Sequence, residues 1–263
     1  MNFLQAKDKI YSKKDFYEAL ERVGIERVGI ERGDCICVHT QLFNLGIALV
    51  GREEFLGILL EVFKELLGEN GTLIMPTFTY DFCNGRDFDK KNHKSTMGVL
   101  TEFFRLQEGV LRSDDPIYSF AIWGADKGDF LSPTPTCFSE NCVYDILAKK
   151  DGKIVLLGTD IVGYTFTHFI EERARVSYRY YKEFSGKIIN ERGLVREKSI
   201  QFYVRDLKQE KSIFSVPKQV DILKANHNFR RESFANACIV SIKAKAYLKD
   251  TLSILSQDEK ALL

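Results

Sequence analysis

The sequence predicts an α/β protein in which helices flank a mixed sheet and the C-terminal third carries an antiparallel hairpin. Strand-like and helix-like segments alternate through the first two thirds of the chain, as they do in sheets covered by helices. The run Ile154–Leu157 is apolar throughout, which is typical of a strand buried on both faces. Beyond residue 176, two strand-like segments are separated by a short polar turn, and this pattern predicts the hairpin.

The first predicted element is an amphipathic helix over Lys13–Arg22. Phe16 and Leu20 recur at helical spacing. Ser12 precedes the helix as a good N-cap residue, and Asp15 stands at the third helical position, so the start of the helix is well defined.

A doubled pentapeptide follows this helix. Glu21–Ile25 and Glu26–Ile30 both read ERVGI. A five-residue period is neither helical nor that of a known solenoid. We therefore expect one copy to be an insertion in a surface turn.

The next segments predict alternating strands and helices. Cys35–Thr40 alternates and contains β-branched residues, as a strand does, whereas Glu53–Leu67 has apolar residues at i, i+3, i+4 and i+7 and ends at Gly68. The same criteria predict two further strands with a helix between them: Thr72–Phe78, Gly98–Leu106 and Ser119–Trp123.

The C-terminal third begins with the predicted hairpin, Val176–Ile189 and Leu194–Val204, joined by the turn Asn190–Gly193. No low-complexity linker separates it from the rest, so we expect a single domain over residues 1–263, with a core of residues 1–175 and a C-terminal part of residues 176–263. Two helices with a short strand between them complete the prediction: Pro217–Ala225, Cys238–Ile242 and Lys243–Leu255.

The composition is that of a globular protein. Of 263 residues, 44% are apolar and 29% charged, which excludes a disordered or collagen-like chain. The N-terminus is polar and lysine-rich, unlike a signal peptide, and no run approaches the roughly 18 apolar residues that span a bilayer. We expect a cytoplasmic protein without a membrane partner, whose six cysteines stay reduced.

One strand offers a candidate metal site, because Cys35, Cys37 and His39 should share a face. The chain has no C-x-x-C pair and no fourth ligand at zinc-like spacing. We therefore predict no metal and interpret these cysteines as small buried residues.

The net charge of +1 conceals an asymmetry. Residues 173–263 hold 19 Lys and Arg against 10 Asp and Glu, a net of +9, which leaves −8 for residues 1–172. The basic residues are spread evenly and lack the clusters and aromatic interleaving of a nucleic-acid interface, so no nucleic-acid partner is expected. Two interpretations remain open: solvated faces that happen to differ, or a basic wall facing a small phosphate-bearing ligand.

The segment Thr165–Glu172 carries the strongest local chemical signal. As N-cap, Thr165 would place His168 in the first helical turn and Glu171 one turn later on the same side. A helix N-terminus lowers the pKa of an imidazole, so His168 would be neutral and able to accept a proton. From this segment alone, the alternative is that His168 has a purely structural role.

Further segments stand in a characteristic order: Val38–Gly46, Met75–Thr79, Ser95–Arg105, and Gly109–Pro116 with Ser119 and Gly124. With the His168 segment, they resemble the antibiotic N-acetyltransferase family, also called aminoglycoside 3-N-acetyltransferases, from about Phe16 to Glu172. The resemblance implies an α/β fold unrelated to GNAT enzymes and transfer of an acetyl group from acetyl-CoA to an amine on a sugar ring. The GNAT pyrophosphate signature and the hexapeptide repeats of β-helix acyltransferases are both absent.

The resemblance also implies roles for residues. His168 would be the general base and Glu171 would orient it, while hydroxyls and amides around Thr40 and Ser95–Gly98 are candidate oxyanion donors. No cysteine stands at a nucleophile position, so direct transfer is favoured over a ping-pong mechanism. The expected CoA-binding residues are His39, Thr40, Gln41, Leu42, Thr77, Ser95, Met97, Gly98 and Ser113, and the expected substrate-binding residues are Tyr80, Asp81, Glu102, Asp115 and Glu172.

Two departures from the family pattern concern the acceptor. Asp115 stands where family members usually carry the histidine of Ser-x-His-Pro, and Cys142-Val143 stands where a Ser-Pro pair is common. A carboxylate beside the expected acceptor cleft would fit a different amine acceptor, a changed proton relay or lost activity. The intact His168 segment favours the first of these.

The basic C-terminal third favours a nucleotide-linked amino sugar, dTDP- or UDP-linked, as in surface glycan synthesis. Its arginines would hold the diphosphate and its tyrosines the base: Arg173, Arg175, Arg179, Tyr178, Tyr180 and Tyr181. One alternative is an aminoglycoside acceptor, bound by the acidic residues of the first two thirds and giving antibiotic resistance. A non-catalytic CoA-binding protein is the alternative from another class, and a monomer or homo-oligomer is equally compatible with the sequence.

Overall fold

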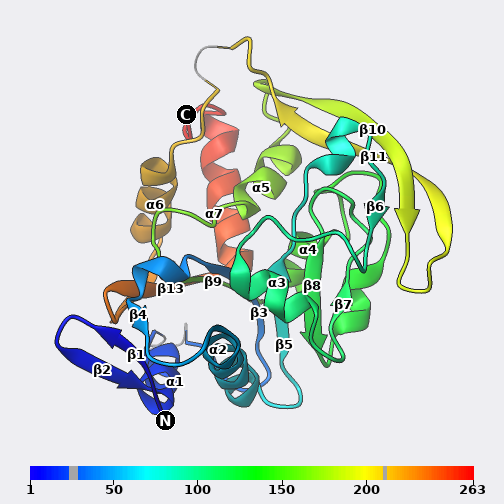
Figure 1. The fold of residues 1–263 in the computed structure, drawn as a ribbon. Coiled ribbons are helices and arrows are strands. Elements are labelled where there is room, and N and C mark those ends of the chain that lie inside the picture. Colours follow the sequence, from blue (N-terminus) through cyan, green and yellow to red (C-terminus); the bar gives the residue numbers. More distant parts are fainter. Residues whose placement is uncertain (24–28, 210–211) are drawn as a thin grey trace.

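The protein, described here by a computed structural model over residues 1–23, 29–209 and 212–263, has an α/β architecture around a central sheet (Figure 1). The sheet has seven strands: β3 (Cys35–Thr40), β5 (Thr72–Pro76), β7 (Leu111–Arg112), β8 (Phe120–Gly124), β9 (Lys153–Leu157), β12 (Arg230–Phe234) and β13 (Ala237–Lys243). Their order is β12-β13-β9-β3-β5-β8-β7. β3 is parallel to both β9 and β5, and the outer pairs are antiparallel. The predicted mixed sheet is confirmed.

Helices cover both faces of the sheet. Ile36 and Val38 pack into the hydrophobic core that contains the first three helices, whereas Cys35 and Cys37 pack into the core of the last four. Because both cores are apolar, β9 shows no alternation in its sequence. The helices are α1 (Lys13–Arg22), α2 (Arg52–Leu67), α3 (Val99–Arg105), α4 (Val143–Lys149), α5 (Phe166–Ala174), α6 (Val216–Ala225) and α7 (Ala244–Gln257).

The predicted start of α1 is confirmed. The Ser12 hydroxyl accepts from the Asp15 amide at 3.2 Å, and the Asp15 carboxylate accepts from the Ser12 amide at 2.7 Å, a reciprocal capping box. The doubled pentapeptide that follows includes residues 24–28, which lie outside the described residues, so the expected insertion is not addressed. The helix α4 was not predicted from the sequence.

The predicted hairpin is confirmed as two eleven-residue strands, β10 (Arg179–Ile189) and β11 (Val195–Arg205), paired along their full length. The end of β10 also pairs in parallel with the short strand β6 (Phe88–Asp89). The hairpin therefore extends beside the main sheet from α5 to the loop around β6 (Figure 1).

The N-terminus contains structure that the sequence did not predict. β1 (Asn2–Ala6) pairs with β2 (Lys9–Ser12) and with β4 (Ile47–Ala48) in a small separate sheet. Phe3 and Leu4 are fully buried beneath it, although the flanking lysines give the segment a polar composition.

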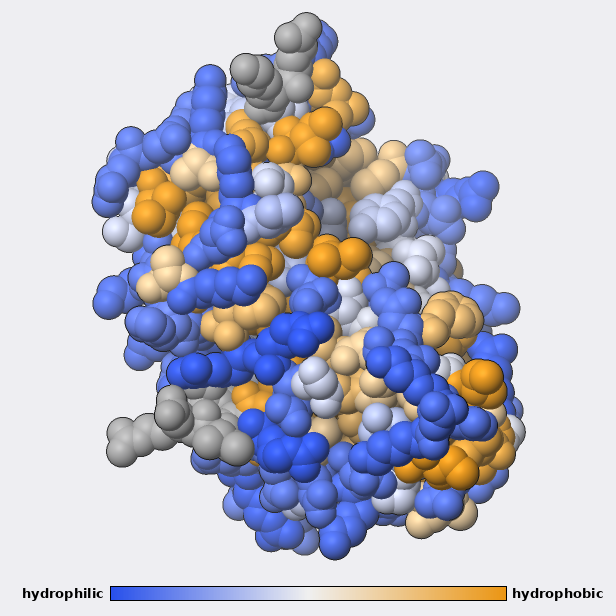
Figure 2. Space-filling view, turned by 90° about the vertical axis from the view of Figure 1, so that its left-hand side faces the viewer, coloured by the Kyte–Doolittle hydropathy of each residue, from blue (hydrophilic) through white to orange (hydrophobic). Residues whose placement is uncertain are grey.

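The surface seen in Figure 2 carries several separate groups of apolar side chains divided by hydrophilic ones. Among the helices of the described ranges, none has the length and apolar character needed to cross a membrane.

Candidate active site

His168 lies in the first turn of α5, where its amide donates to the carbonyl of Thr165 at 3.0 Å. The rings of Tyr118 and Phe138 have centroids 6.4 and 6.0 Å from the imidazole, and the side chain keeps 27% exposure. Burial lowers the pKa of His168, with Arg179 acting in the same direction and Glu171 against it. The ring is thus neutral near pH 7 and partly open to solvent, as a general base requires.

Thr165 stands at the expected N-cap position of α5, but its side chain does not cap the helix. Thr165 has helical backbone angles, and its side chain makes no capping hydrogen bond. Its hydroxyl instead interacts with the buried phenol of Tyr144. His168 keeps its place in the first turn because the carbonyls of Tyr164 and Thr165 accept hydrogen bonds from the amides of Thr167 and His168, which start the helix.

Glu171 is fully buried one turn after His168. Its Oε2 lies 3.2 Å from Nδ1 of His168 and 2.7 Å from Nη2 of Arg179, while Oε1 accepts from the Tyr178 hydroxyl at 3.1 Å. Burial acts to raise the pKa of Glu171, but the hydrogen bond with His168 and the charge of Arg179 outweigh it, and the pKa falls. An ionised carboxylate therefore faces Nδ1.

Two further carboxyl groups belong to the same region. Asp115 accepts from the amides of Ile117 and Tyr118, each at 2.7 Å, through Oδ1, and Glu172 accepts from the Thr136 hydroxyl through Oε1. Burial raises the pKa of both carboxyl groups. The second oxygen of each is buried and has no hydrogen-bond partner among the described residues.

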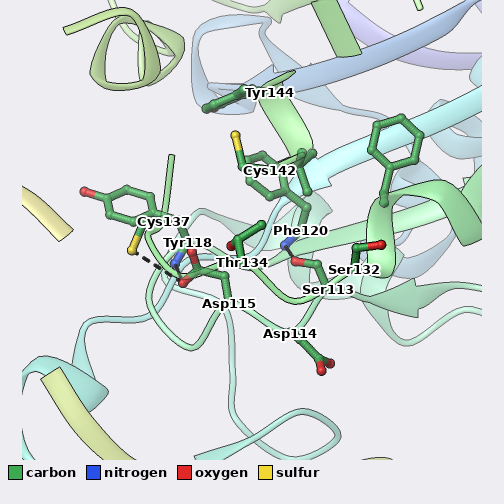
Figure 3. Close-up of a pocket in the computed structure, with 12 residues that line it drawn as sticks. Ser113, Asp114, Asp115, Tyr118, Phe120, Ser132, Thr134, Cys137, Cys142 and Tyr144 are labelled. Carbon is green, nitrogen blue, oxygen red and sulfur yellow. Dashed lines mark hydrogen bonds between the residues drawn. The ribbon is translucent and has the colours of Figure 1, made fainter. Parts of the chain in front are cut away.

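Figure 3 shows the small pocket beside Asp115. The Cys137 thiol points toward the Asp115 carboxylate, at 3.8 Å from Oδ1, whereas Asp114 points away from it. Asp114 instead pairs with Lys90 at 2.7 Å and with Arg196 of the hairpin. The pocket holds only about 20 Å³, enough for one water molecule but not for a sugar.

The end of β3 and the loop after it contain four of the expected CoA-binding residues. His39 is buried, where burial lowers its pKa to about 4, and its Nε2 lies 3.4 Å from the Tyr144 hydroxyl. Thr40 and Gln41 are half-buried, and the Gln41 amide donates to Leu157 of β9 at 2.8 Å. Leu42 begins a short 3-10 turn and faces a cleft. The structure therefore places Thr40, Gln41 and Leu42 at the surface and His39 in the core.

That cleft has a volume of about 410 Å³ and lies between the loop after β3, the start of α2 and the start of α3. Its lining is mainly apolar: Leu42, Phe43, Gly46, Ala48, Val50, Arg52, Phe55, Leu56 and Val99. Phe43 is 91% exposed at its edge.

The turn before α3 is closed by its own side chains. The Glu102 carboxylate accepts from the Ser95 amide at 2.8 Å and from Arg105, and the Ser95 hydroxyl accepts from the Met97 amide at 3.1 Å. These two amides are occupied, and Glu102 holds the turn. Gly98 has a φ of 116°, a conformation that favours glycine.

Thr77 and Ser113 are buried, and their hydroxyl groups take part in hydrogen bonds at the edge of the sheet. The Thr77 hydroxyl lies 3.1 Å from that of Ser119, and the Ser113 hydroxyl accepts from the Phe120 amide at 2.9 Å. Arg112, which the sequence analysis missed, donates to the Thr77 carbonyl at 2.6 Å and to the His93 carbonyl at 2.6 Å. It ties the segment before α3 to the sheet.

Tyr80 and Asp81 lie on the exposed side of the site. Tyr80 is 46% exposed, and its ring is 6.0 Å from that of Tyr118. Asp81 accepts from or pairs with His93 at 2.8 Å and Arg86 at 3.5 Å.

The residues brought together around His168 come from separate parts of the chain. Of these residues, Glu171, Glu172 and Asp115 were predicted from the sequence. Tyr118 and the aromatic wall that it forms were not. Tyr118 packs against Phe138 at 4.7 Å and Phe202 at 5.0 Å. No short motif marks these rings, because they meet only when the hairpin folds over the site.

Comparison with protein-family models gives a match to the aminoglycoside 3-N-acetyltransferase model over residues 37–255. The chain belongs to this family. Membership confirms the enzyme class expected from the resemblance, an acyltransferase that acetylates amines.

Two curated relatives of this family member are also similar over much of their length. The chain is 25% identical over 246 residues to the SPbeta prophage-derived aminoglycoside N(3')-acetyltransferase-like protein YokD of Bacillus subtilis, covering 83% of each chain. It is 24% identical over 178 residues to aminoglycoside N(3)-acetyltransferase VII of Streptomyces paromomycinus, covering 60% of each.

Solved structures of aminoglycoside acetyltransferases share the fold. The binary complex of AAC-IIIb with CoASH has a TM-score of 0.78 at 20% identity, with 94% of this chain and 97% of that chain covered. AAC-VIa with bound sisomicin, by room-temperature neutron and X-ray diffraction, has a TM-score of 0.79 at 17% identity, with coverages of 94% and 98%.

Part of the basic wall expected for a nucleotide sugar is engaged in other contacts in this family member. Arg173 donates to Asp145 at 2.5 Å, Arg179 is paired with Glu171, and Tyr178 is fully buried. These side chains neutralise and support the acidic part of the protein. These contacts account for part of the +9 charge that favoured a nucleotide-linked acceptor, whereas Tyr180 and Tyr181 remain exposed.

Proposed function

We propose that the protein transfers the acetyl group of acetyl-CoA directly to an amino group of an aminoglycoside-type amino sugar, with His168 as the general base. The observation that carries this proposal is the arrangement of His168, whose Nδ1 faces Glu171 and whose Nε2 has no partner among the described residues. Family membership supports the reaction class, and the CoASH complex of AAC-IIIb supports the co-substrate.

The chemical step follows from the geometry. Nε2 of His168 accepts a proton from the acceptor ammonium group, and the freed nitrogen attacks the thioester carbonyl. The C–N bond forms, the C–S bond breaks, and CoA leaves as a thiolate. The second proton, which the nitrogen loses as the amide forms, passes to this thiolate, while the first is released from His168 to solvent. The Glu171 carboxylate stabilises the imidazolium that forms on His168.

The cleft beside Leu42 and Val99 suits the CoA arm. It is largely apolar, and Thr40 and Gln41 stand beside it at the end of β3. An apolar cleft with a few polar groups at its edge is the usual lining of a cofactor site. We assign Thr40, Gln41 and Leu42 to CoA. His39, Thr77 and Ser113 are buried and have a structural role.

The acceptor side combines aromatic and acidic groups. The buried Tyr118 ring packs beside His168, and the half-exposed Tyr80 ring packs against Tyr118. Asp81 is only partly buried. Aromatic faces and carboxylates suit a sugar that carries ammonium groups. The two curated relatives have aminoglycoside acetyltransferase names, which favours the same acceptor class here.

The test is a thiol-release assay with acetyl-CoA and a panel of sisomicin, gentamicin, apramycin and UDP- and dTDP-linked amino sugars. We expect release with one or more aminoglycosides and a loss of about 10²–10⁴-fold in His168→Asn. His227→Asn is the matched control, since His227 is exposed in a turn and tolerates asparagine at its positive φ. CoA affinity, measured by calorimetry, should be unchanged in both variants.

Release only with nucleotide-linked sugars would overturn the acceptor class. CoA binding without release from any acceptor would favour the non-catalytic alternative. Full activity of His168→Asn would overturn the assignment of the base.

A further inference from the structure

Nδ1 of His168 has two neighbours with opposite requirements. Oε2 of Glu171, at 3.2 Å, accepts a proton, whereas Nη2 of Arg179, at 2.9 Å, donates one. The same Nη2 lies 2.7 Å from Oε2 of Glu171. The three groups thus form a closed triangle around one imidazole nitrogen.

Only one imidazole tautomer can act as a base toward the acceptor. With the proton on Nδ1, the ring donates to Glu171 and leaves the Nε2 lone pair free. With the proton on Nε2, Nδ1 accepts from Arg179 and the ring cannot take a proton from the acceptor. The position of Arg179 relative to Glu171 therefore decides which tautomer the site holds.

Arg179 is held firmly in this position. It is the first residue of β10, is 8% exposed, and donates through Nη1 to the Tyr203 carbonyl at 3.0 Å. The side chains of Arg179 and Glu171 are only 5% and 1% exposed, so their ion pair is shielded from water.

We propose that Arg179 is a positioning residue for the acetyl transfer: its guanidinium holds the Glu171 carboxylate so that His168 stays unprotonated, with Nε2 directed to the acceptor. This inference rests on the proposed role of His168. An unpaired carboxylate beside His168 would favour the imidazolium, which cannot act as a base. Arg179 offsets that effect while leaving Glu171 free to orient the ring.

The other charged and polar groups around the imidazole do not replace Arg179. Arg205 of β11 also disfavours the imidazolium, but no contact joins it to Glu171. Tyr178 donates to Oε1 of Glu171 and carries no charge. Tyr118 and Phe138 supply ring surface only.

The test compares Arg179→Met, Arg179→Lys and the control Arg173→Met in the full-length protein. Arg173 lies on the same helix as His168, and its ion pair is with Asp145. The chain has four histidines, so the ¹⁵N signals of His168 can be followed in pH titrations and assigned by their loss in His168→Asn. The pH dependence of kcat/KM is measured in parallel with an accepted aminoglycoside.

We expect the His168 titration midpoint to rise by about one pH unit in Arg179→Met. The acid limb of kcat/KM should move by the same amount, which accounts for less than about tenfold of the loss at pH 7. Loss of ring positioning should bring the total loss to the order of 100-fold. Arg179→Lys should return the midpoint toward that of the unmodified protein but recover only part of the rate, because an ammonium lacks the guanidinium fork. Arg173→Met should leave both midpoints unchanged.

A merely structural Arg179 would give a different pattern. Arg179→Met would then lose thermal stability and activity, while the His168 midpoint and the acid limb stayed in place, and the proposal would be wrong. If the unmodified protein released no thiol with any of the acceptors tested, the proposed function would fail. The NMR titration would still decide the role of Arg179.

Discussion

Glu171 and Glu172 are consecutive, buried residues of α5 whose carboxyl groups have pKa values shifted in opposite directions. Glu171 is paired with Arg179, whereas one oxygen of Glu172 has no partner among the described residues. Both anchor the hairpin, Glu171 through Tyr178 and Arg179, and Glu172 through the Tyr181 hydroxyl at 3.4 Å. One helix turn therefore joins the proposed base to the wall of the acceptor site.

Replacing Glu171 with glutamine should destabilise the protein by about 3 kcal/mol at pH 7, because it leaves the buried Arg179 without its counter-charge. The folded-state pKa of Glu171 is depressed, so its contribution exists above the unfolded pKa and is lost as the pH falls through the folded pKa. Urea unfolding of both proteins from pH 7.5 to pH 3 measures the difference. A difference that stays constant down to the lowest pH would contradict the ionised state of Glu171.

Glu172→Gln is the matched variant and should behave oppositely. Its amide oxygen still accepts from Thr136, and no ionised group has to be buried. The folded-state pKa of Glu172 is raised, so the stability of the unmodified protein is fully present below the unfolded pKa and falls as the pH rises toward the folded pKa.

We therefore expect Glu172→Gln to gain up to about 1 kcal/mol near pH 8 and nothing near pH 3. The same urea series measures this gain. Equal losses in the two glutamine variants at neutral pH would show that their environments do not differ as the structure indicates.

Gly158→Ala should disturb the loop that we assign to CoA. Gly158 directly follows β9 with a φ of 85°, and an added Cβ would lie 2.4 Å from the Gln41 carbonyl oxygen. The Asn44 side chain also donates to the Gly158 carbonyl at 2.8 Å. Strain and contact together should cost about 1–3 kcal/mol and weaken CoA binding.

Gly57→Ala is the control for this variant. Gly57 lies within α2, and an added Cβ there meets nothing within 4 Å. Alanine in a helix is favoured over glycine by about 0.5–1 kcal/mol, so the control should gain stability and keep CoA affinity. Thermal unfolding and calorimetry with CoA give both quantities. Unchanged CoA affinity in a folded Gly158→Ala protein would remove this loop from the CoA site.

Much of the fold was predictable because periodic burial leaves a trace in the sequence. The capping box of Ser12 and Asp15, the uninterrupted apolar strand β9 and the polar turn of the hairpin each depend on residues close together in the chain. β1 was missed because its buried Phe3 and Leu4 stand among lysines and polar residues, so composition outweighed the local pattern.

The site was predictable only in part, because composition does not show which distant residues form ion pairs with each other. The +9 charge of the C-terminal third suggested a phosphate ligand, but Arg173, Arg179 and Arg196 pair with carboxylates of the first 172 residues. The aromatic wall of Tyr118 likewise depends on contacts with Phe138 and Phe202 that form only in the folded chain.

Direct transfer predicts that the cysteines do not form an acetyl-enzyme. Burial raises the pKa of Cys35 and of Cys142 to about 12, and it raises the pKa values of Cys37 and Cys137 well above their usual range. A thiol that stays protonated is a poor nucleophile at pH 7.5. Cys137 is the informative test, since it lies beside Asp115 and the aromatic wall next to His168.

Cys137→Ala should lose less than roughly tenfold in kcat/KM, well below the loss expected for removal of a general base. Initial velocities at varied acetyl-CoA and acceptor concentrations should give intersecting rather than parallel lines, because both substrates must be bound before the C–N bond forms. The matched control is Cys238→Ala on β13, away from the proposed base. Parallel lines, release of CoA without acceptor, or an acetylated Cys137 in the intact mass spectrum would each show that the acetyl group passes through the enzyme and that His168 does not act directly on the acceptor in a single step.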